Sequence, residues 1–331
     1  MRVLVTGASG MLGAGVAKAL AARGDSVTVL QRRPSGLGLP EVLADVADSA
    51  VVQRALTGQD AVIHLAAKVN VVGPEREFQR VNVEGTRAVI DGCRQTGVQR
   101  LVYVSTPSVA HSGHALVGVG PAPAEPAAAR GPYARTKAVA EHMALAADTN
   151  GLAVVALRPH LVFGPGDAQL IARLVDRARR SRLPVIGSGA ALIDTTYVSN
   201  AVDAFVAALD RCEQVHGQAL VVTNGEPRPI AELLGAICDA TGVPQPTRRV
   251  SPGLAKSAGS AAQLAWAIHD HFWPDHRVED PPITRFVVEQ MSTAHWFDQR
   301  QTRRLLHWEP RISLDAGLEE LRRHYLRLGS T

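Results

Sequence analysis

Uninterrupted apolar runs alternate with helical patterns through the first half of the chain. Such runs, separated by about 10–20 residues of helical spacing, are typical of parallel strands that helices cover on both faces. The strands that this pattern predicts are residues 2–6, 26–30, 61–65, 101–105 and 153–157, with a first helix at residues 12–23. We therefore expect a doubly wound α/β domain with a parallel sheet, a Rossmann arrangement.

The pattern changes after residue 164, where we predict a domain boundary. Residues 1–164 form the first domain, and residues 165–331 form a smaller, mostly helical one, with residues 196–223 returning to the first. The elements predicted in this second part are helices at 168–181, 230–241 and 251–273, extended pieces at 185–189 and 193–198, and a further sheet strand at 217–223.

Composition excludes several broad classes of protein. With 46% hydrophobic and 20% charged residues, the chain of 331 residues buries a sizeable core and is not globally disordered. Only 4% of the residues are aromatic, which argues against a stacking surface for single-stranded nucleic acid. The net charge is +4, but the arginines are scattered singly or in pairs, so we expect no nucleic-acid partner.

Cysteine usage and apolar stretches bear on the compartment. Cys93, Cys212 and Cys238 are widely spaced and odd in number, so neither a disulfide framework nor a zinc site is indicated. No charged leader followed by an apolar stretch opens the chain, and no run of about 18 uncharged apolar residues occurs. We expect a soluble, cytoplasmic protein without a membrane span or a bound metal.

A glycine-rich turn stands directly between the first predicted strand and the first predicted helix. Its spacing, GxxGxxG, is a variant of the dinucleotide-binding fingerprint. Glycines there allow a tight turn and a close approach of the backbone to a diphosphate, and the helix N-terminus is aimed at negative charge. The residues predicted to contact a dinucleotide here are Gly7, Ser9, Gly10, Met11, Leu12 and Gly13.

The end of the second predicted strand bears on the choice of coenzyme. A carboxylate there would bind a ribose 2′-hydroxyl, but the residues are Gln31, Arg32 and Arg33. Two guanidinium groups can instead pair with a 2′-phosphate, so NADP(H) is favoured over NAD(H); the alternative is that both are solvated loop charges. Asp45, beside Val46, is either an acceptor for the adenine amino group or a turn residue.

Tyr133 and Lys137 stand one helical turn apart in a predicted helix and therefore share a face. Lowering the pKa of a tyrosine by three units from about 10 takes about 4 kcal/mol. One ammonium at about 4 Å in a surface-like dielectric supplies about that much. We therefore predict Tyr133 as the acid/base for a carbonyl or alcohol oxygen, with Lys137 as its electrostatic partner.

A hydroxyl is also needed to orient the substrate oxygen. Ser105, Thr106 and Ser108 lie at the end of a predicted strand, at the carboxyl edge of the sheet where ligands of such sheets bind. Thr106 is the preferred residue, with Ser105 second. For Ser105 and Ser108 the alternative is that their hydroxyls satisfy backbone groups at the strand end.

Together these motifs resemble the extended short-chain dehydrogenase/reductase superfamily. The segments that carry the resemblance are residues 6–13, 62–67 (VIHLAA), 81–86 (VNVEGT), 102–105, 133–137, 158–160 (RPH), 162–167 (VFGPGD) and 195–198. The resemblance implies a Tyr/Lys/hydroxyl site with NAD(P). Aligning Val109 with the family's strand-end valine puts the catalytic hydroxyl on Thr106.

The same resemblance implies roles for further residues. It gives Asn82 a structural or proton-relay role, and it puts Pro159 and Val162 beside the nicotinamide. Ala66 and Ala67 fall beside the nicotinamide ribose, with Leu65 next to them. The absence of an acid after the second strand departs from the NAD-preferring pattern.

Within the superfamily, the sequence is similar to the 3β-hydroxysteroid dehydrogenase branch, including reductases of long-chain 2-alkyl-3-oxoalkanoates. The segments are residues 105–108, 158–167 and 305–314. This branch implies hydride transfer between the nicotinamide and a secondary-alcohol carbon of a bulky apolar substrate. The superfamily also implies a homodimer. The apolar residues of 251–273 predict a helix that lines a pocket, lies on a membrane surface or is an ordinary core helix.

The sequence is compatible with two other functions. A nucleotide-sugar epimerase or dehydratase uses the same coenzyme machinery but must hold a diphosphate, for which Arg173, Arg248 or Arg249 are candidates. A non-catalytic NADP-binding redox sensor is the other, and the Tyr/Lys pair counts against it. Three histidines near the end of the predicted helix 251–273, His269, His271 and His276, suggest a metal site at first sight. They have no set of acidic partners, so we do not expect a metal there.

Overall fold

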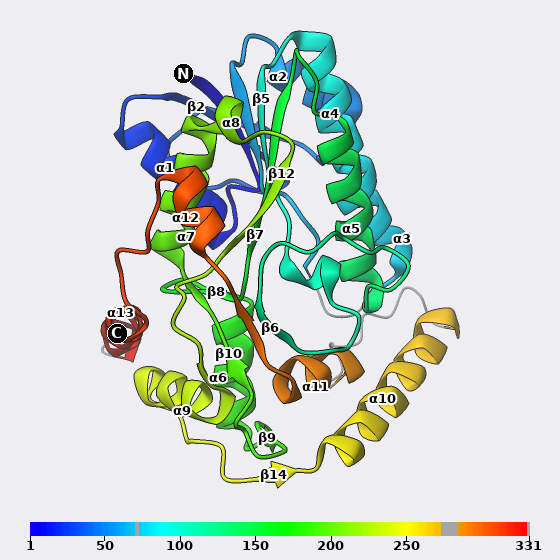
Figure 1. The fold of residues 1–331 in the computed structure, drawn as a ribbon, viewed down its shortest axis with the longest axis vertical. Helices are drawn as coiled ribbons and strands as arrows, with labels where there is room; N and C mark the ends of the chain where they lie inside the picture. Colours follow the sequence, from blue (N-terminus) through cyan, green and yellow to red (C-terminus); the bar gives the residue numbers. More distant parts are fainter. Residues whose placement is uncertain (70–72, 273–283, 330–331) are drawn as a thin grey trace.

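A parallel sheet forms the centre of the molecule (Figure 1). The computed structural model describes residues 1–69, 73–272 and 284–329, and within them this sheet has seven strands in the order β12-β7-β5-β4-β1-β2-β3. All of its strand pairs are parallel. The strands are β1 (Arg2–Thr6), β2 (Ser26–Gln31), β3 (Glu41–Leu43), β4 (Ala61–His64), β5 (Arg100–Val104), β7 (Ala153–Pro159) and β12 (Gln218–Val222). The strand order reverses at β1, and ligands of such sheets bind at this switch point.

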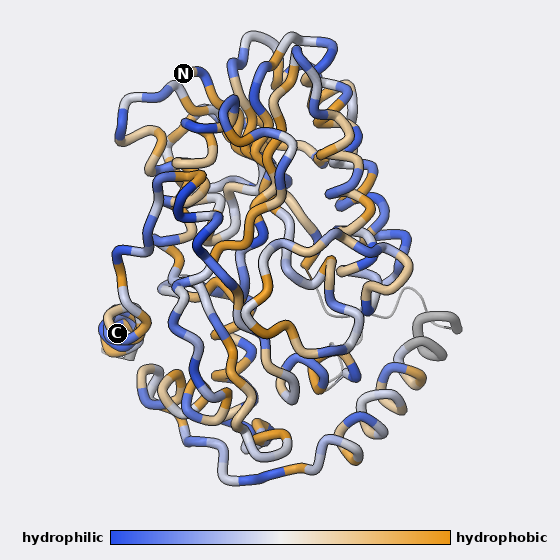
Figure 2. Tube along the Cα trace, in the orientation of Figure 1, coloured by the Kyte–Doolittle hydropathy of each residue, from blue (hydrophilic) through white to orange (hydrophobic). Residues whose placement is uncertain are grey.

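Helices cover both faces of the sheet, and Figure 2 shows the apolar strands between them. On one face are α1 (Met11–Ala22) and α7 (Val198–Asp210), and on the other are α2 (Ser49–Leu56), α4 (Gly85–Thr96) and α5 (Gly131–Ala146). The strands read as continuous apolar runs because both of their faces are buried. The predicted α/β fold class is confirmed.

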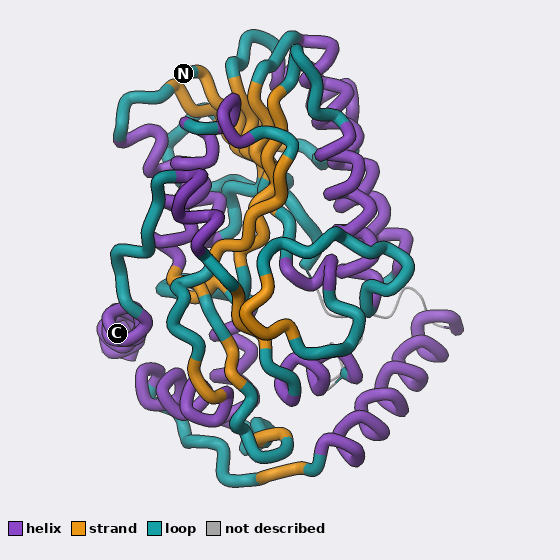
Figure 3. Tube along the Cα trace, in the orientation of Figure 1, coloured by secondary structure: helices purple, strands orange, loops and turns teal. Residues whose placement is uncertain are grey.

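A second hydrophobic core lies beyond the carboxyl edge of the sheet. It is built mainly by α6 (Leu170–Arg179), α9 (Ile230–Thr241) and α13 (Leu314–Gly329). Beside it runs a small sheet in the order β13-β10-β15-β6, and Figure 3 shows this mixture of short strands and helices. Its strands are β6 (Leu116–Val119), β10 (Leu192–Ile193), β13 (Arg228–Pro229) and β15 (His295–Phe297).

The remaining elements are short, apart from one long helix. They are α3 (Glu75–Phe78), the π-helical turn η1 (Gln79–Glu84), the 3₁₀ turn η2 (Pro107–Ala110), α8 (Cys212–Val215), α10 (Pro252–Phe272), α11 (Arg285–Ser292) and α12 (Arg300–Leu306). Two strand pairs complete the set: β8 (Val162–Phe163) with β11 (Thr196–Tyr197), and β9 (Val185–Ile186) with β14 (Arg249–Val250).

Some elements differ from the sequence prediction. Residues 193–198, predicted as one extended piece, fall into β10, β11 and the start of α7, and the two strands, which Asp194 and Thr195 separate, pair with different partners. Near the C-terminus, Leu306 and Trp308 join the core on the α1 face of the sheet. The predicted boundary at residue 164 stays a prediction. Trp273 and His276 lie outside the described residues, as do the side chains of His269 and His271.

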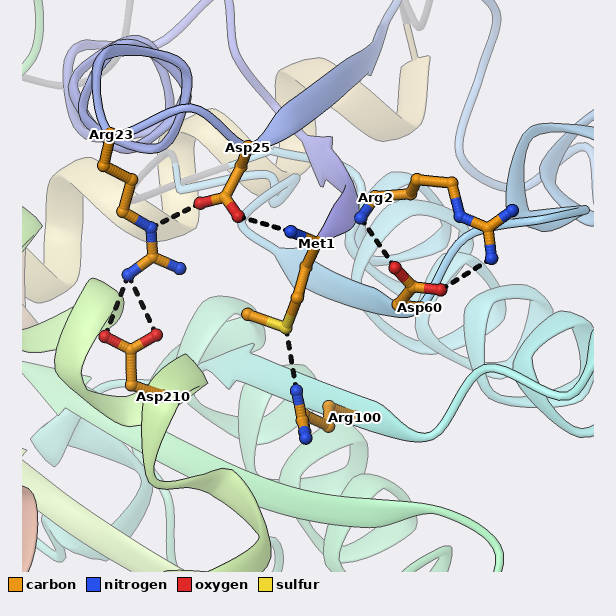
Figure 4. Close-up of polar contacts among 7 residues, drawn as sticks. All are labelled: Met1, Arg2, Arg23, Asp25, Asp60, Arg100 and Asp210. Carbon is orange, nitrogen blue, oxygen red and sulfur yellow. Dashed lines mark hydrogen bonds and ion pairs between the residues drawn. The ribbon is translucent and has the colours of Figure 1, made fainter.

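The amino ends of the strands carry a network of charged side chains, opposite the edge where the strands end (Figure 4). Arg2 donates to Asp60 at 2.8 Å from its backbone N–H and at 2.7 Å from its guanidinium. The amino group of Met1 donates to Asp25 at 2.7 Å. Arg23 pairs with Asp25 and reaches both carboxylate oxygens of Asp210 at 2.8 Å, which ties the ends of α1 and α7 together.

Candidate active site

A cleft of about 1250 Å³ opens at the carboxyl edge of the parallel sheet. Its walls come from the ends of β1, β2, β4, β5 and β7 and from α5, α6, α9 and α11. The residues predicted from the sequence that line it are Gly7, Ser9, Gly10, Met11, Leu12, Gly13, Gln31, Arg32, Asp45, Val46, Leu65, Ala66, Ala67, Thr106, Tyr133, Lys137, Pro159 and Val162. Two predicted residues, Arg33 and Asn82, do not line the cleft in the part of the chain that the structure describes.

The glycine turn is packed so tightly that side chains are excluded from two of its positions. Gly7 has φ +79°, and a Cβ there would lie 2.7 Å from the backbone nitrogen of Ala66. A Cβ on Gly13 would lie 2.3 Å from the carbonyl oxygen of Gly7. Helix α1 begins at this turn without a side-chain cap and without an acid in its first turn. Its free N–H groups and its positive dipole end fit a diphosphate, so the turn fits a dinucleotide.

The end of β2 brings one of the two predicted arginines to the cleft. Arg32 is exposed and lines the cleft, whereas Arg33 is exposed and lies outside it. Gln31 is buried and donates from Nε2 to the carboxylate of Glu41 on β3 at 2.6 Å. Glu41 also accepts from the backbone N–H of Ser35 at 3.1 Å, and it does not line the cleft as described. The sequence did not indicate this acid because β3 has only three residues.

Asp45 is held as a turn residue. Its carboxylate accepts from the backbone N–H of Ala47 at 3.0 Å and pairs with Arg80 at 2.6 Å. Burial raises the pKa of Asp45, but these two contacts outweigh burial and hold that pKa below its usual value. One of its two predicted roles is thus observed, and contact with an adenine stays a prediction.

Tyr133 and Thr106 meet in the cleft from two different elements. Tyr133 lies in the first turn of α5, which begins at Gly131-Pro132, a proline position that suits a helix start. Thr106 follows β5 and accepts a hydrogen bond from the Ser108 N–H at 3.3 Å, which holds its side chain at the strand end. Burial raises the pKa of Tyr133 to about 12, and hydrogen bonding to Thr106 opposes that rise.

The raised pKa of Tyr133 differs from the expected lowering by Lys137. The ammonium of Lys137 is buried and donates to the backbone carbonyl of Val104 at 2.5 Å, so its charge is directed at that carbonyl. Burial lowers the pKa of Lys137 to about 7, which Glu141 opposes. Spacing in a helix predicts a shared face, but it does not predict which acceptor a buried ammonium finds.

Asn82 joins the loop after β4 to α5. Its side-chain oxygen accepts from the backbone N–H of Lys68 at 2.8 Å, and its amide donates to Thr136 at 3.0 Å. These contacts favour the structural role over the relay role. Asn82 is buried in η1, next to the helix that carries Tyr133 and Lys137.

Among the cleft-lining residues to which the sequence patterns gave no role are His160, Arg285 and Glu289. His160 follows Pro159 at the end of β7, and it was part of a motif without an assigned chemistry. Arg285 and Glu289 lie on α11, where Arg285 donates to Glu289 at 3.0 Å. The signal in the sequence was a polar pair at i and i+4, Arg285 and Glu289, with three apolar residues between them.

The site is typical of one family of coenzyme-dependent enzymes. Residues 3–223, more than half of the chain, match the NAD dependent epimerase/dehydratase family. The chain belongs to this family. Its extended short-chain dehydrogenase/reductase character, predicted from the glycine turn and the Tyr/Lys pair, is confirmed, and the chain is an enzyme of the oxidoreductase type.

Relatives of this epimerase/dehydratase family member include two dehydrogenases or reductases. It is 39% identical over 333 residues to the 2-alkyl-3-oxoalkanoate reductase of Stenotrophomonas maltophilia (strain K279a), covering 97% of this chain and 98% of that protein. It is 29% identical over 337 residues to the sterol-4-alpha-carboxylate 3-dehydrogenase, decarboxylating, of Mus musculus, covering 98% of this chain and 91% of that protein. The predicted 3β-hydroxysteroid dehydrogenase-like branch is confirmed.

A solved structure shows the same fold with ligands bound. MoeE5 in complex with UDP-glucose and NAD is 27% identical to this family member, with a TM-score of 0.75 and 100% coverage of both chains.

Of the three arginines that the sequence offered for binding a diphosphate, Arg173 lines the cleft. Arg248 and Arg249 lie outside its described lining.

The described residues contain neither a membrane-spanning helix nor a metal centre. In the part of the chain that the structure describes, no helix has the length and apolar character needed to cross a membrane. Within the same residues, no group of three or more histidine, cysteine or acidic side chains is arranged to hold a metal ion. The three cysteines are buried and free.

Proposed function

We propose that this enzyme interconverts a ketone and a secondary alcohol on a bulky apolar substrate, with NADP(H) as its preferred coenzyme. The observation that carries the proposal is the meeting of Tyr133, Thr106 and Lys137 in the cleft that begins at the glycine turn. One wall of that cleft carries many apolar side chains, and these fit an aliphatic or alicyclic body. The residues of this wall include Leu170, Leu174, Ile193, Ile230, Leu233, Leu234, Ile237 and Met291.

The protonation states support a reduction with Tyr133 as the acid. A phenol with a pKa of about 12 keeps its proton at neutral pH and donates it from Oη to a ketone oxygen. Thr106 hydrogen-bonds the same oxygen and orients it. When bound, the dinucleotide supplies the hydride. Lys137, with a pKa of about 7, exchanges protons at neutral pH and can return one to the site.

The names of the two relatives narrow the substrate class. A 2-alkyl-3-oxoalkanoate and a sterol-4-alpha-carboxylate both carry a carboxyl group on the carbon next to the one that bears the reacting oxygen. Both also carry a large apolar body. We therefore assign the substrate to 3-oxo or 3-hydroxy acids with an apolar substituent on the carbon between the two oxygenated groups.

The preference for NADP(H) is supported by the end of β2. Arg32 lines the cleft there, and a guanidinium pairs well with a 2′-phosphate. The acid of that region, Glu41, is engaged by Gln31 and Ser35. A homodimer remains a prediction from the family.

A nucleotide-sugar epimerase or dehydratase is the second candidate function. The observation in its favour is Arg173, which lines the cleft on α6. The apolar wall of α9 counts against it, because a sugar presents hydroxyl groups that this wall leaves without partners. A non-catalytic redox sensor does not require an acid/base group, so the presence of Tyr133, Thr106 and Lys137 in one cleft counts against that function.

The test is turnover by the purified chain with either coenzyme, followed by coenzyme fluorescence. The panel contains 2-alkyl-3-hydroxyalkanoic acids, 3β-hydroxysteroids and UDP-sugars. We expect oxidation of one of the first two classes, and Tyr133→Phe should lower kcat at least about a hundredfold with coenzyme affinity changed a few-fold at most.

The matched control is Tyr197→Phe, because the Tyr197 hydroxyl bonds to Glu320 on α13 and does not line the described cleft. This variant should keep its turnover. Full activity of Tyr133→Phe, or turnover of UDP-sugars alone, contradicts the proposal.

A further inference from the structure

A cluster of buried polar side chains abuts the cleft beside the acid/base residues. It consists of His111, His160, His295 and Glu289, all at most 5% exposed. Each has one nitrogen or oxygen that is buried without a hydrogen-bond partner: His111 Nε2, His160 Nε2, His295 Nδ1 and Glu289 Oε2. Unpaired buried polar atoms are costly, and native proteins retain few of them, so the cluster calls for an explanation.

His160 is the histidine of this cluster that lines the cleft. It follows Pro159 at the end of β7, and β7 lies next to β5, where Val104 pairs with Leu157. The Ser105 N–H donates to the Leu157 carbonyl at 2.6 Å, which extends this pairing beyond β5. The chain ends that carry Thr106 and His160 are therefore neighbours at one edge of the sheet.

The His160 side chain is held in one place from several sides. Its backbone N–H donates to Val222 at 3.2 Å, and its carbonyl accepts from the Thr196 hydroxyl at 2.8 Å. Its ring packs edge-on against Phe297, with ring centroids 5.2 Å apart, and beside His295 at 6.1 Å.

The backbone beside His160 is strained. The next residue, Leu161, has φ +43°, a conformation that L residues with a large side chain rarely adopt, and Leu161 also lines the cleft. Strain of this kind persists at sites where the position of a side chain matters.

We propose that His160 is a specificity-determining residue whose imidazole ring binds the carboxyl group next to the reacting carbon of the substrate. This assignment rests on the proposed function, because only that substrate class places a carboxyl beside the oxygen held by Tyr133 and Thr106. The His160 ring, whose Nε2 has no partner within the protein, gains a hydrogen bond when the substrate binds, and a ligand without the carboxyl does not supply it.

The surrounding charges permit this contact. Burial lowers the pKa of His160 to about 3 and that of His295 to about 4, and it also lowers the pKa of His111, so these rings are neutral and each carries one N–H. Glu289 is the acid of the cluster, and the pair that it makes with Arg285 at 3.0 Å balances its charge. A neutral N–H donor is what a carboxylate can use without a competing ion pair.

The experiment compares two stable substrates in the oxidation direction. One is a 2-alkyl-3-hydroxyalkanoic acid, and the other is the secondary alcohol with hydrogen in place of the carboxyl. We expect kcat/KM of the wild-type enzyme to be at least about tenfold higher for the acid. His160→Phe should bring this ratio close to one, mainly through KM for the acid, whereas His160→Gln keeps a donor and should retain most of it.

The matched control is His295→Phe, since His295 is equally buried but is absent from the described lining of the cleft. Its ratio should stay at the wild-type value. An unchanged ratio in His160→Phe overturns the inference and assigns the carboxyl to the arginines of the cleft.

The wild-type comparison separates the two proposals without any variant, so a misfolded His160→Phe does not remove the test. If the wild-type enzyme oxidises both compounds equally well, the proposed function stands and the His160 subsite is wrong. If it oxidises neither compound, nor any other 3-hydroxy compound of the panel, both proposals fail.

Discussion

The ammonium of Lys137 lies over the ring of Tyr103, 4.1 Å from its centroid. Tyr103 is fully buried on β5, so the ring face offers the charge a partial substitute for water. With the Val104 carbonyl at 2.5 Å, this contact fixes the amine one helical turn beyond Tyr133. The two contacts do not fully offset burial, since the pKa of Lys137 still falls to about 7.

Replacing this amine should make the protein more stable. The pKa of Lys137 lies below its ordinary value of 10.5, so between about pH 7 and 10.5 the unfolded chain binds a proton that the folded chain lacks. The free energy of unfolding of the wild type therefore rises with pH across this window. We expect the free energy of unfolding of Lys137→Met to exceed that of the wild type by on the order of 2 kcal/mol at pH 6. The difference should shrink towards pH 10.

Urea denaturation at a series of pH values measures this effect, and activity should be lost throughout. Lys18→Met is the control, because Lys18 is exposed on α1 and its replacement should change stability by less than about 0.5 kcal/mol at every pH. A Lys137→Met variant that is less stable than the wild type at pH 6 would show that the contacts with Tyr103 and Val104 outweigh burial.

The two arginines after β2 should differ in their effect on coenzyme binding. Arg32 lines the cleft and Arg33 does not, although both are exposed. Arg32→Ala should weaken NADPH about tenfold and NADH about twofold or less, because only NADPH offers a 2′-phosphate to the guanidinium. Fluorescence titration with each coenzyme measures both constants. Arg33→Ala is the control, and equal losses for NADPH and NADH in Arg32→Ala would remove the argument for NADP(H).

The buried ion pair between Glu141 and Arg158 should be costly to break. Both side chains are at most 2% exposed, and the guanidinium donates to the carboxylate at 2.5 and 2.8 Å and to the carbonyl of Ala122 at 2.6 Å. Glu141→Leu leaves a buried charge unpaired, so we expect a loss of about 3–5 kcal/mol in the free energy of unfolding.

Removing both charges tests whether the loss comes from the unpaired partner. The double variant Glu141→Leu with Arg158→Met should recover at least about half of the loss. Thermal and urea unfolding give the comparison, with the exposed pair of Asp176 and Arg180 as a control that should change stability by about 0.5 kcal/mol or less. Additive losses in the double variant would mean that the two side chains act independently.

The parts of the fold that the sequence predicts well are those with strong local signals. Strand β1 and helix α9 have the predicted bounds, and the glycine turn and the carboxyl edge follow from them because a parallel sheet brings all its strand ends together. The same logic brings Thr106 and Tyr133 into one cleft. These predictions need only periodicity and topology.

The parts that escaped prediction depend on contacts between distant segments. Strands β6 and β15 have three or four residues each and pair across about 180 positions of the sequence, so neither carries a periodic signal of its own. The unexpectedly high pKa of Tyr133 likewise follows from burial and from the carbonyl that Lys137 finds. His160 is a candidate because its buried Nε2 has no hydrogen-bond partner, and such a property is visible only in the folded structure.

The two ends of the parallel strands serve different purposes. The charged network of Figure 4 lies at their amino ends, and the cleft lies at their carboxyl ends. Substitutions in the residues around the substrate therefore leave the ion pairs at the opposite edge of the sheet unchanged. The same framework can thus carry a cleft with a different lining, and accept a different substrate, without losing the contacts that join the starts of the strands.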